Sequence, residues 1–520
     1  MTAVAAPSVA SLVQSVDWLA IAPPTIAAVV ALAVLVADLF LGDRRKALLG
    51  WVSVAGLAAA ALSLLPLLDG DRSTFCLDTL KGEQAACSYT ADHFTLVIQF
   101  LVLAGALLTA LLSVTGIKDV KNTTRELPEG EFWFLLLSSA AGAALLPASR
   151  DLATLVVALE VASLPAFALV GIKRDDRRSA EAALKFFLSS VTATAVTLLG
   201  VSFVYATTGT LHLTRIATAL THVDGQFQTL AQAGVALTLV GFAFKTAAAP
   251  FHFWVPDTYV GAPLPVAAYL SVIGKAVGFS GLILVTVVAF PSYADVWGPA
   301  LAALAALTMT VGNVAALRQQ ATRAYSAVRL LAWSSVGQAG YLLVPIAAAA
   351  YSKDAGKAIG STVAYALMYA AVNLGAFAVA ALVARTKPLN RISDYRGLYA
   401  SRPLAALVLG FFLLSLAGLP PGIIGLFAKV TVFSAAVDAG LGWLAVVMAV
   451  NVVIALYYYL RWTATLFRPA EEPAEEPAGE QQVQRVPAPL TAAIGLTAII
   501  GVALSGAPQI VLRFASTGLF

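Results

Sequence analysis

Long apolar segments recur along nearly the whole chain, and polar residues gather in short stretches between them. A transmembrane α-helix needs about 20 mostly apolar residues, and fourteen segments meet this requirement. The pattern therefore predicts an all-α polytopic membrane protein. The predicted spans are residues 20–41, 47–68, 93–116, 131–149, 151–172, 180–207, 231–257, 264–290, 297–317, 325–349, 358–384, 403–437, 440–467 and 488–512.

The seventh and twelfth predicted spans are unusually long and contain residues that interrupt a helix. The seventh holds Pro250 and Pro256, and the twelfth holds Gly418, Pro420 and Pro421. Proline lacks an N–H donor and clashes with the preceding turn, and backbone groups freed in lipid need a partner or a wet cavity. We expect both helices to be broken; a simple proline kink is the alternative at each site.

Composition and charge support a membrane protein. Of the 520 residues, 60% are hydrophobic and 12% are charged, whereas soluble domains have about 25% charged residues. The net charge of +4 is small and scattered, which argues against nucleic acid as a partner. No basic residue precedes Arg44, so the first apolar run lacks the charged start of a signal peptide and is expected to remain as a span.

Basic residues in the loops predict the orientation. Alternate loops, beginning with the first, carry 21 of the 32 Lys and Arg residues, the opposite loops carry seven, and four lie within spans. Basic loops stay in the cytoplasm, so both termini are expected outside. The second loop then lies in an oxidising compartment where Cys76 and Cys87 can form a disulfide; two free thiols are the alternative. Residues 468–487, with a repeated Glu-Glu-Pro-Ala, are predicted to be a cytoplasmic linker.

Several ionisable residues fall inside the apolar segments: Glu160, Lys185, Lys245, Lys275 and Lys429. Each opposes insertion by roughly 2.5–3.5 kcal/mol, so each calls for a role. A lysine near a helix end can lift its ammonium to the interface, and this explanation competes for Lys185, near the start of its span. Glu160, Lys245 and Lys275 are too central for that and are expected to face the protein interior.

These residue types suit proton transfer. Burial lowers the pKa of a lysine and raises that of a glutamate, so both approach neutral pH. A Glu–Lys pair on neighbouring helices can switch the proton affinity of the lysine by closing or separating, without a metal or cofactor. A structural ion pair uses the same residues, but four lysines on four spans favour a proton path.

The two broken spans share the pattern Gly-x-x-x-Lys, at residues 241–245 and 425–429. They are five spans apart, and a repeat with an odd number of spans must enter the membrane in the inverted orientation. We therefore predict an N-terminal three-helix segment (1–130), a first five-helix repeat (131–290), a second, inverted repeat (297–467), the linker (468–487) and a C-terminal helix (488–520).

Two stretches resemble the antiporter-like proton-pumping subunits of respiratory complex I. One runs from Gly-Phe-Ala-Phe-Lys at 241–245 through Pro-Phe-His-Phe-Trp-Val-Pro-Asp at 250–257, and the other is Ser-Leu-Ala-Gly-Leu-Pro-Pro-Gly at 415–422. The resemblance extends over essentially the whole chain. The length favours the subunit N type of NADH–quinone oxidoreductase, because subunit L adds spans and subunit M typically has glutamate where Lys429 stands.

The resemblance implies roles for single residues. Glu160 would be the fifth-helix acid that pairs with Lys245, Lys275 the eighth-helix lysine, Lys429 the exit residue, and Lys185 the sixth-helix lysine. The cytoplasmic entry would lie near the seventh-helix break. His252 lies in the signature and is a candidate proton carrier; a hydrogen-bonded structural histidine is the alternative.

The resemblance also implies a bacterial cell membrane, with other membrane subunits of complex I as partners. NADH, flavin, Fe–S clusters and quinone are expected on other subunits, because this chain has no Gly-rich dinucleotide loop, Fe–S cysteine set or metal cluster. A subunit of a multisubunit sodium/proton antiporter is the first alternative, and it shares the lysines. A membrane scaffold that pumps nothing is the second.

Overall fold

The computed structural model describes residues 16–77, 86–119, 127–470 and 486–516. Within these ranges, thirteen helices are long and apolar enough to cross a membrane, so the chain is a multi-pass membrane protein, as predicted. Twelve are α1 (Ala22–Phe40), α2 (Ala47–Leu62), α3 (His93–Asp119), α4 (Glu129–Leu145), α5 (Leu152–Val170), α6 (Arg177–Thr208), α8 (Gln228–Thr246), α12 (Ala294–Leu317), α13 (Ser326–Ala349), α14 (Ala355–Ala384), α18 (Gly442–Leu466) and α19 (Ala488–Gly506).

The thirteenth span is an irregular helix, which the sequence did not predict. Its α-helical parts are α10 (Leu264–Tyr269) and α11 (Lys275–Ile283), and each is followed by a π-helical turn, η6 (Leu270–Gly274) and η7 (Leu284–Ala289). A π-helical turn re-aims the side chains that follow it and often marks a functional site. Lys275 is the first residue after η6.

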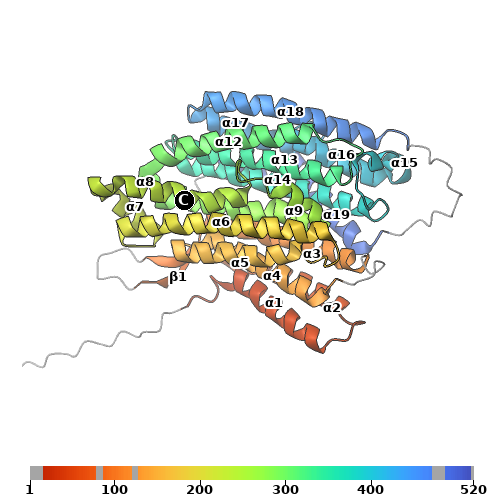
Figure 1. Cartoon of the computed structure of the whole chain (residues 1–520), viewed down its shortest axis with the longest axis horizontal. Helices are drawn as coiled ribbons and strands as arrows, with labels where there is room; N and C mark the ends of the chain where they lie inside the picture. Colours follow the sequence, from red (N-terminus) through yellow and green to blue (C-terminus); the bar gives the residue numbers. More distant parts are fainter. Residues whose placement is uncertain (1–15, 78–85, 120–126, 471–485, 517–520) are drawn as a thin grey trace, which may run out of the picture.

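The long helices run side by side, and two of them form the centre of the bundle (Figure 1). The apolar windows of α13 and α14 are 94% and 89% buried, whereas those of α1 and α19 are 28% and 22% buried. The peripheral helices therefore present apolar side chains outward, as lipid or neighbouring membrane subunits require.

Both predicted helix breaks are present, and neither is a simple kink. In the seventh span, α8 ends at Thr246, Ala247 adopts the left-handed conformation (φ 68°), and the chain resumes as the short helix α9 (Val255–Gly261). In the twelfth span, α16 (Pro403–Ala417) and α17 (Ile423–Asp438) flank Gly418, which has φ 86°. With α16 and α17 counted as one interrupted span, all fourteen predicted spans have a helical counterpart.

A small β-hairpin at one end of the bundle was not foreseen by the all-α prediction. Strands β1 (Arg72–Cys76) and β2 (Cys87–Ala91) pair in antiparallel register with Cys76 opposite Cys87, whose sulfur atoms are 2.05 Å apart. Figure 1 shows β1 and the short helix α7 (Leu213–Ala219) at the end of the bundle opposite to α15 (Leu398–Ser401). This separation agrees with the predicted alternation of the loops.

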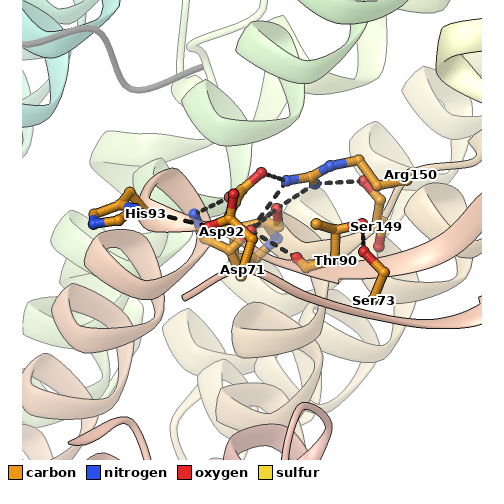
Figure 2. A network of polar contacts seen from close by, with 9 residues as sticks. Asp71, Ser73, Thr90, Asp92, His93, Ser149 and Arg150 are labelled. Carbon is orange, nitrogen blue, oxygen red and sulfur yellow. Dashed lines mark hydrogen bonds and ion pairs between the residues drawn. The ribbon is translucent and has the colours of Figure 1, made fainter. Parts of the chain in front are cut away.

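An arginine ties the hairpin to the helices. The Arg150 guanidinium pairs with the Asp92 carboxylate and donates hydrogen bonds to the carbonyls of Pro147 (2.9 Å) and Ser149 (3.0 Å), as Figure 2 shows for the labelled residues. Burial raises the pKa of the neighbouring Tyr89 in β2 to about 12, so its hydroxyl stays protonated and donates to the carbonyl of Ala20 (3.0 Å). The hairpin is thereby fixed to the ends of α1 and α4.

Some predictions fall outside the described residues. Both chain termini and residues 471–485 of the predicted linker lie there. The division into repeats at 131–290 and 297–467 stays a prediction.

Candidate proton-relay site

Glu160 lies on α5 and Lys245 on α8, and the two side chains do not form a salt bridge. No carboxylate oxygen of Glu160 is within 4.0 Å of the Lys245 ammonium, although the carboxylate exerts a Coulombic attraction on it. Instead, the Thr194 hydroxyl of α6 donates a 2.6 Å hydrogen bond to Glu160. The predicted pair is therefore held in an open arrangement, with the acid anchored on α6.

The Lys245 ammonium is surrounded by aromatic rings and borders a cavity. The ring centres of Phe167 and Phe186 are each 4.9 Å from its Nζ, and that of Phe244 is 5.7 Å away. Such rings attract a cation through their negative faces. The cavity wall is mostly apolar, and the hydroxyl groups that border it come from Ser139, Ser163 and Tyr269.

Lys275 binds the end of the first half of the broken seventh span. Lys275 is only 2% exposed. Its Nζ donates a 3.2 Å hydrogen bond to the carbonyl of Thr246, the last residue of α8. The last carbonyls of a helix have no partner within the helix, and they carry partial negative charge. The close approach needs Gly278, because a Cβ atom there would lie 2.3 Å from the Thr246 nitrogen.

Lys429 likewise binds the carbonyl end of a helix, at the break of the twelfth span. Its Nζ donates to the carbonyls of Leu416 (2.9 Å) and Ala417 (2.6 Å), the last two residues of α16. It also borders a cavity with Gln338, Tyr365 and Tyr369. Both breaks thus place a buried ammonium against free helix carbonyls, an arrangement that only the tertiary structure reveals.

A hydrogen-bonded polar network lies between the regions of Lys275 and Lys429, and the sequence analysis missed it. Tyr369 of α14 donates to the carbonyl of Ser271 (3.2 Å) and contacts the hydroxyl of Ser335 (3.1 Å), while Asn373 donates to the Ser271 hydroxyl (2.6 Å). Ser271 lies one turn before Lys275, and Tyr369 borders the Lys429 cavity. These uncharged residues at helical spacing on α13 and α14 resemble ordinary core positions, so only their mutual contacts single them out.

The other two predicted site residues lie at different places. Lys185 is half-exposed and pairs with Glu181 (2.7 Å) and Asp257 (2.9 Å), so the structure does not bring it into the buried set. His252 lies within the break of the seventh span, between α8 and α9, and the centre of its ring lies 5.6 Å from that of Trp333. Its Nδ1 is buried without a hydrogen-bond partner among the described residues.

Comparisons with known proteins identify the family. Residues 149–455 match the transmembrane family described as NADH:quinone oxidoreductase/Mrp antiporter. A curated NADH-quinone oxidoreductase subunit N 2 of Streptomyces griseus is 77% identical over 519 residues, which cover 98% of this chain and 95% of the relative. The chain belongs to the NADH-quinone oxidoreductase subunit N family. A second member, from Salinispora tropica, is 45% identical over 473 residues, with 88% and 87% covered.

Chains of solved structures share the fold of this chain. A chain of respiratory complex I from Thermus thermophilus superposes with a TM-score of 0.73 at 31% identity, covering 95% of this chain and 100% of that one. A chain of the Mrp complex from Dietzia sp. superposes with a TM-score of 0.79 at 22% identity, covering 96% and 97%, which shows a shared fold. Among the described residues, no group of three or more His, Cys, Asp or Glu is arranged to hold a metal.

Proposed function

We propose that this chain is the proton-translocating membrane subunit N of a bacterial NADH–quinone oxidoreductase, working with other membrane subunits of that complex. Electron transfer from NADH to quinone occurs on other subunits and drives protons through the buried residues of this one. The observation that carries the proposal is the set of three buried lysines, each at a cavity or a helix break, beside a polar network that joins η6 to α13 and α14.

Lys245 and Glu160 would form the switchable step. Two unit charges 4 Å apart attract by about 4 kcal/mol at an effective dielectric constant of 20, and by about half of that at twice the distance. Moving Glu160 toward Lys245 would therefore change the proton affinity of the lysine by about 2 kcal/mol, or roughly 30-fold. The open arrangement, with Glu160 bonded to Thr194, is the state in which Lys245 releases its proton more readily.

Lys275 and Lys429 would couple charge to the shape of the broken helices. A protonated amine binds free helix carbonyls more strongly than a neutral one, because charged donors make stronger hydrogen bonds. Protonation would therefore strengthen the hydrogen bonds from the lysine to the helix carbonyls at each break, and proton release would weaken them. We assign Lys185 and His252 to the approach from the cytoplasmic side, near the seventh-span break.

Orientation follows from the same proposal. We place both termini and the β-hairpin on the outer side of the cell membrane, with the disulfide between Cys76 and Cys87 formed there. The basic loops lie in the cytoplasm.

The second candidate is a subunit of a multisubunit sodium/proton antiporter, which the fold shared with the Mrp complex chain supports. The 77% identity to a subunit N favours the first candidate. Copurification separates the two: a subunit N purifies with an NADH-oxidising arm, and an antiporter subunit does not.

The test is Lys245→Ala and Glu160→Ala, each in the assembled complex in inverted membrane vesicles. We expect NADH–ferricyanide reduction at the parent level, which shows assembly, and NADH-driven proton uptake reduced by about 10²-fold or more, as for loss of an acid–base group. Lys353→Ala, at an exposed lysine, is the matched control and should pump normally. Normal coupled pumping by both assembled variants would refute the assigned roles.

A further inference from the structure

The short helix α9, which follows the break of the seventh span, is joined to two other helices by a single carboxylate. One oxygen of Asp257 lies 2.9 Å from the Lys185 ammonium of α6, and the other lies 3.5 Å from the Arg329 guanidinium of α13. An ionised carboxylate has two acceptor oxygens and can serve two cations in this way. Asp257 therefore ties α9 to helices that lie far apart in the chain.

The helix α9 also packs closely on α6 at both of its ends. A Cβ atom at Gly261 would lie 2.5 Å from the Cβ of Ala182 and 2.6 Å from the carbonyl oxygen of Arg178, so the close approach needs glycine. At the start of α9, the Trp254 ring stacks on the Phe186 ring of α6, with centres 4.3 Å apart and an interplanar angle of 11°. These contacts fix the place of α9 on α6.

The stacked rings lead to the Lys245 ammonium. Phe186 directly follows Lys185 on α6, and its ring centre is 4.9 Å from the Lys245 Nζ. Phe186 and Trp254 both line the cavity that borders Lys245. Trp254 precedes Asp257 by three residues, which is less than one helical turn, so a displacement of Asp257 carries Trp254 with it. The ion pairs of Asp257 and the aromatic wall at Lys245 are thus mechanically connected.

We propose that Asp257 is a positioning residue for the proton-transfer step at Lys245. Its two ion pairs hold α9 against α6 and α13, and the seated helix keeps the aromatic wall of the Lys245 cavity in place. Lys185 then acts as a fixed positive charge and not as a proton carrier. This inference rests on the proposed function and deepens it, because it gives the half-exposed charges beside the seventh-span break a mechanical role.

The size of the effect follows from the two ion pairs. An exposed pair shifts an equilibrium by up to about fivefold, so the loss of both pairs should let α9 open up to about 25-fold more often. Amide hydrogen exchange over residues 255–261 should accelerate accordingly in Asp257→Asn. A displacement of about 1 Å can lower a rate by about 10²-fold, so NADH-driven proton uptake in this variant should fall by about tenfold or more.

Substitutions that keep the charge should keep the activity. In inverted vesicles, Asp257→Asn and Lys185→Met should lower proton uptake by about tenfold and about fivefold, whereas Asp257→Glu and Lys185→Arg should stay within about twofold of the parent. Arginine keeps the positive charge but does not release a proton in proteins. NADH–ferricyanide reduction measures assembly throughout. Glu181→Gln is the matched control, because it removes the other carboxylate at Lys185 (2.7 Å) and leaves α9 untouched.

A merely structural contribution is distinguished by its coupling to the aromatic wall. Phe186→Leu removes the ring that lies between α9 and the Lys245 ammonium. If Asp257 acts through this ring, adding Asp257→Asn to Phe186→Leu should change proton uptake by less than about twofold, whereas the effects of independent sites multiply. If Asp257→Asn does not assemble, Lys185→Met takes its place in this comparison.

Three results would overturn the positioning role: parent-level uptake by assembled Asp257→Asn, a loss in Lys185→Arg as large as that in Lys185→Met, or effects that multiply in the double variant. Lys245→Ala in the same assay separates this failure from that of the proposed function. If Lys245→Ala does not pump, the proposed function stands and only the positioning role fails; if Lys245→Ala also pumps normally, both fail.

Discussion

The clearest single test of the mechanism is the replacement of Lys429 by methionine, which has similar length and no charge. The change removes two hydrogen bonds, to the carbonyls of Leu416 and Ala417. A hydrogen bond from a charged donor contributes about 1.5–3 kcal/mol. The local structure at the break of the twelfth span should therefore lose roughly 3–6 kcal/mol of stabilisation. At 1.4 kcal/mol per factor of ten, it should open about 10²- to 10⁴-fold more often.

Two measurements follow from this loss. Amide hydrogen exchange over residues 414–425 should accelerate in Lys429→Met, and NADH-driven proton uptake in inverted vesicles should fall to background while NADH–ferricyanide reduction persists. Lys353→Met is the control for an exposed lysine. An unchanged rate of amide hydrogen exchange in Lys429→Met would show that the ammonium does not stabilise the structure at the break.

Lys429→Arg separates holding the break from moving a proton. Arginine keeps the positive charge and the donors that bind the carbonyls, but its guanidinium does not release a proton in proteins. We therefore expect exchange over residues 414–425 close to that of the parent and proton uptake at background. An arginine variant that pumps at the parent rate would refute a proton-transfer role for Lys429 and leave only the structural one.

Three further substitutions test the structure. Lys275→Met loses one bond to Thr246, so the seventh-span break should weaken by about 1.5–3 kcal/mol; unchanged amide exchange near residue 246 would contradict this. Gly425→Ala should prevent assembly, measured by copurification, because its Cβ would lie 1.6 Å from the Ser415 carbonyl oxygen; a normally assembled variant would contradict that geometry. Arg150→Ala leaves Asp92 without its partner and should cost roughly 3–5 kcal/mol; an unchanged melting temperature of the purified complex would refute an anchoring role.

The sequence alone determined the spans and their breaks. Hydrocarbon offers no partner for backbone groups, so every crossing segment must be apolar, helical and about 20 residues long, and this requirement is readable in one dimension. Prolines and glycines at 250, 256, 418, 420 and 421 marked the two interrupted helices for the same reason. The cost of a charge in lipid likewise singled out Glu160 and the four lysines.

Only the tertiary structure decided what those residues touch. Lys185 and Lys245 look alike as lysines within apolar segments, but Lys185 reaches the carboxylates of Glu181 and Asp257 near the helix end, whereas Lys245 is enclosed by aromatic rings. The π-helical turn before Lys275 leaves no mark in the apolar pattern of the sequence. The tyrosines around Lys429 are uncharged and do not interrupt that pattern either. Their roles depend on contacts between helices far apart in the chain, and hydrophobic periodicity, which describes one helix at a time, does not contain them.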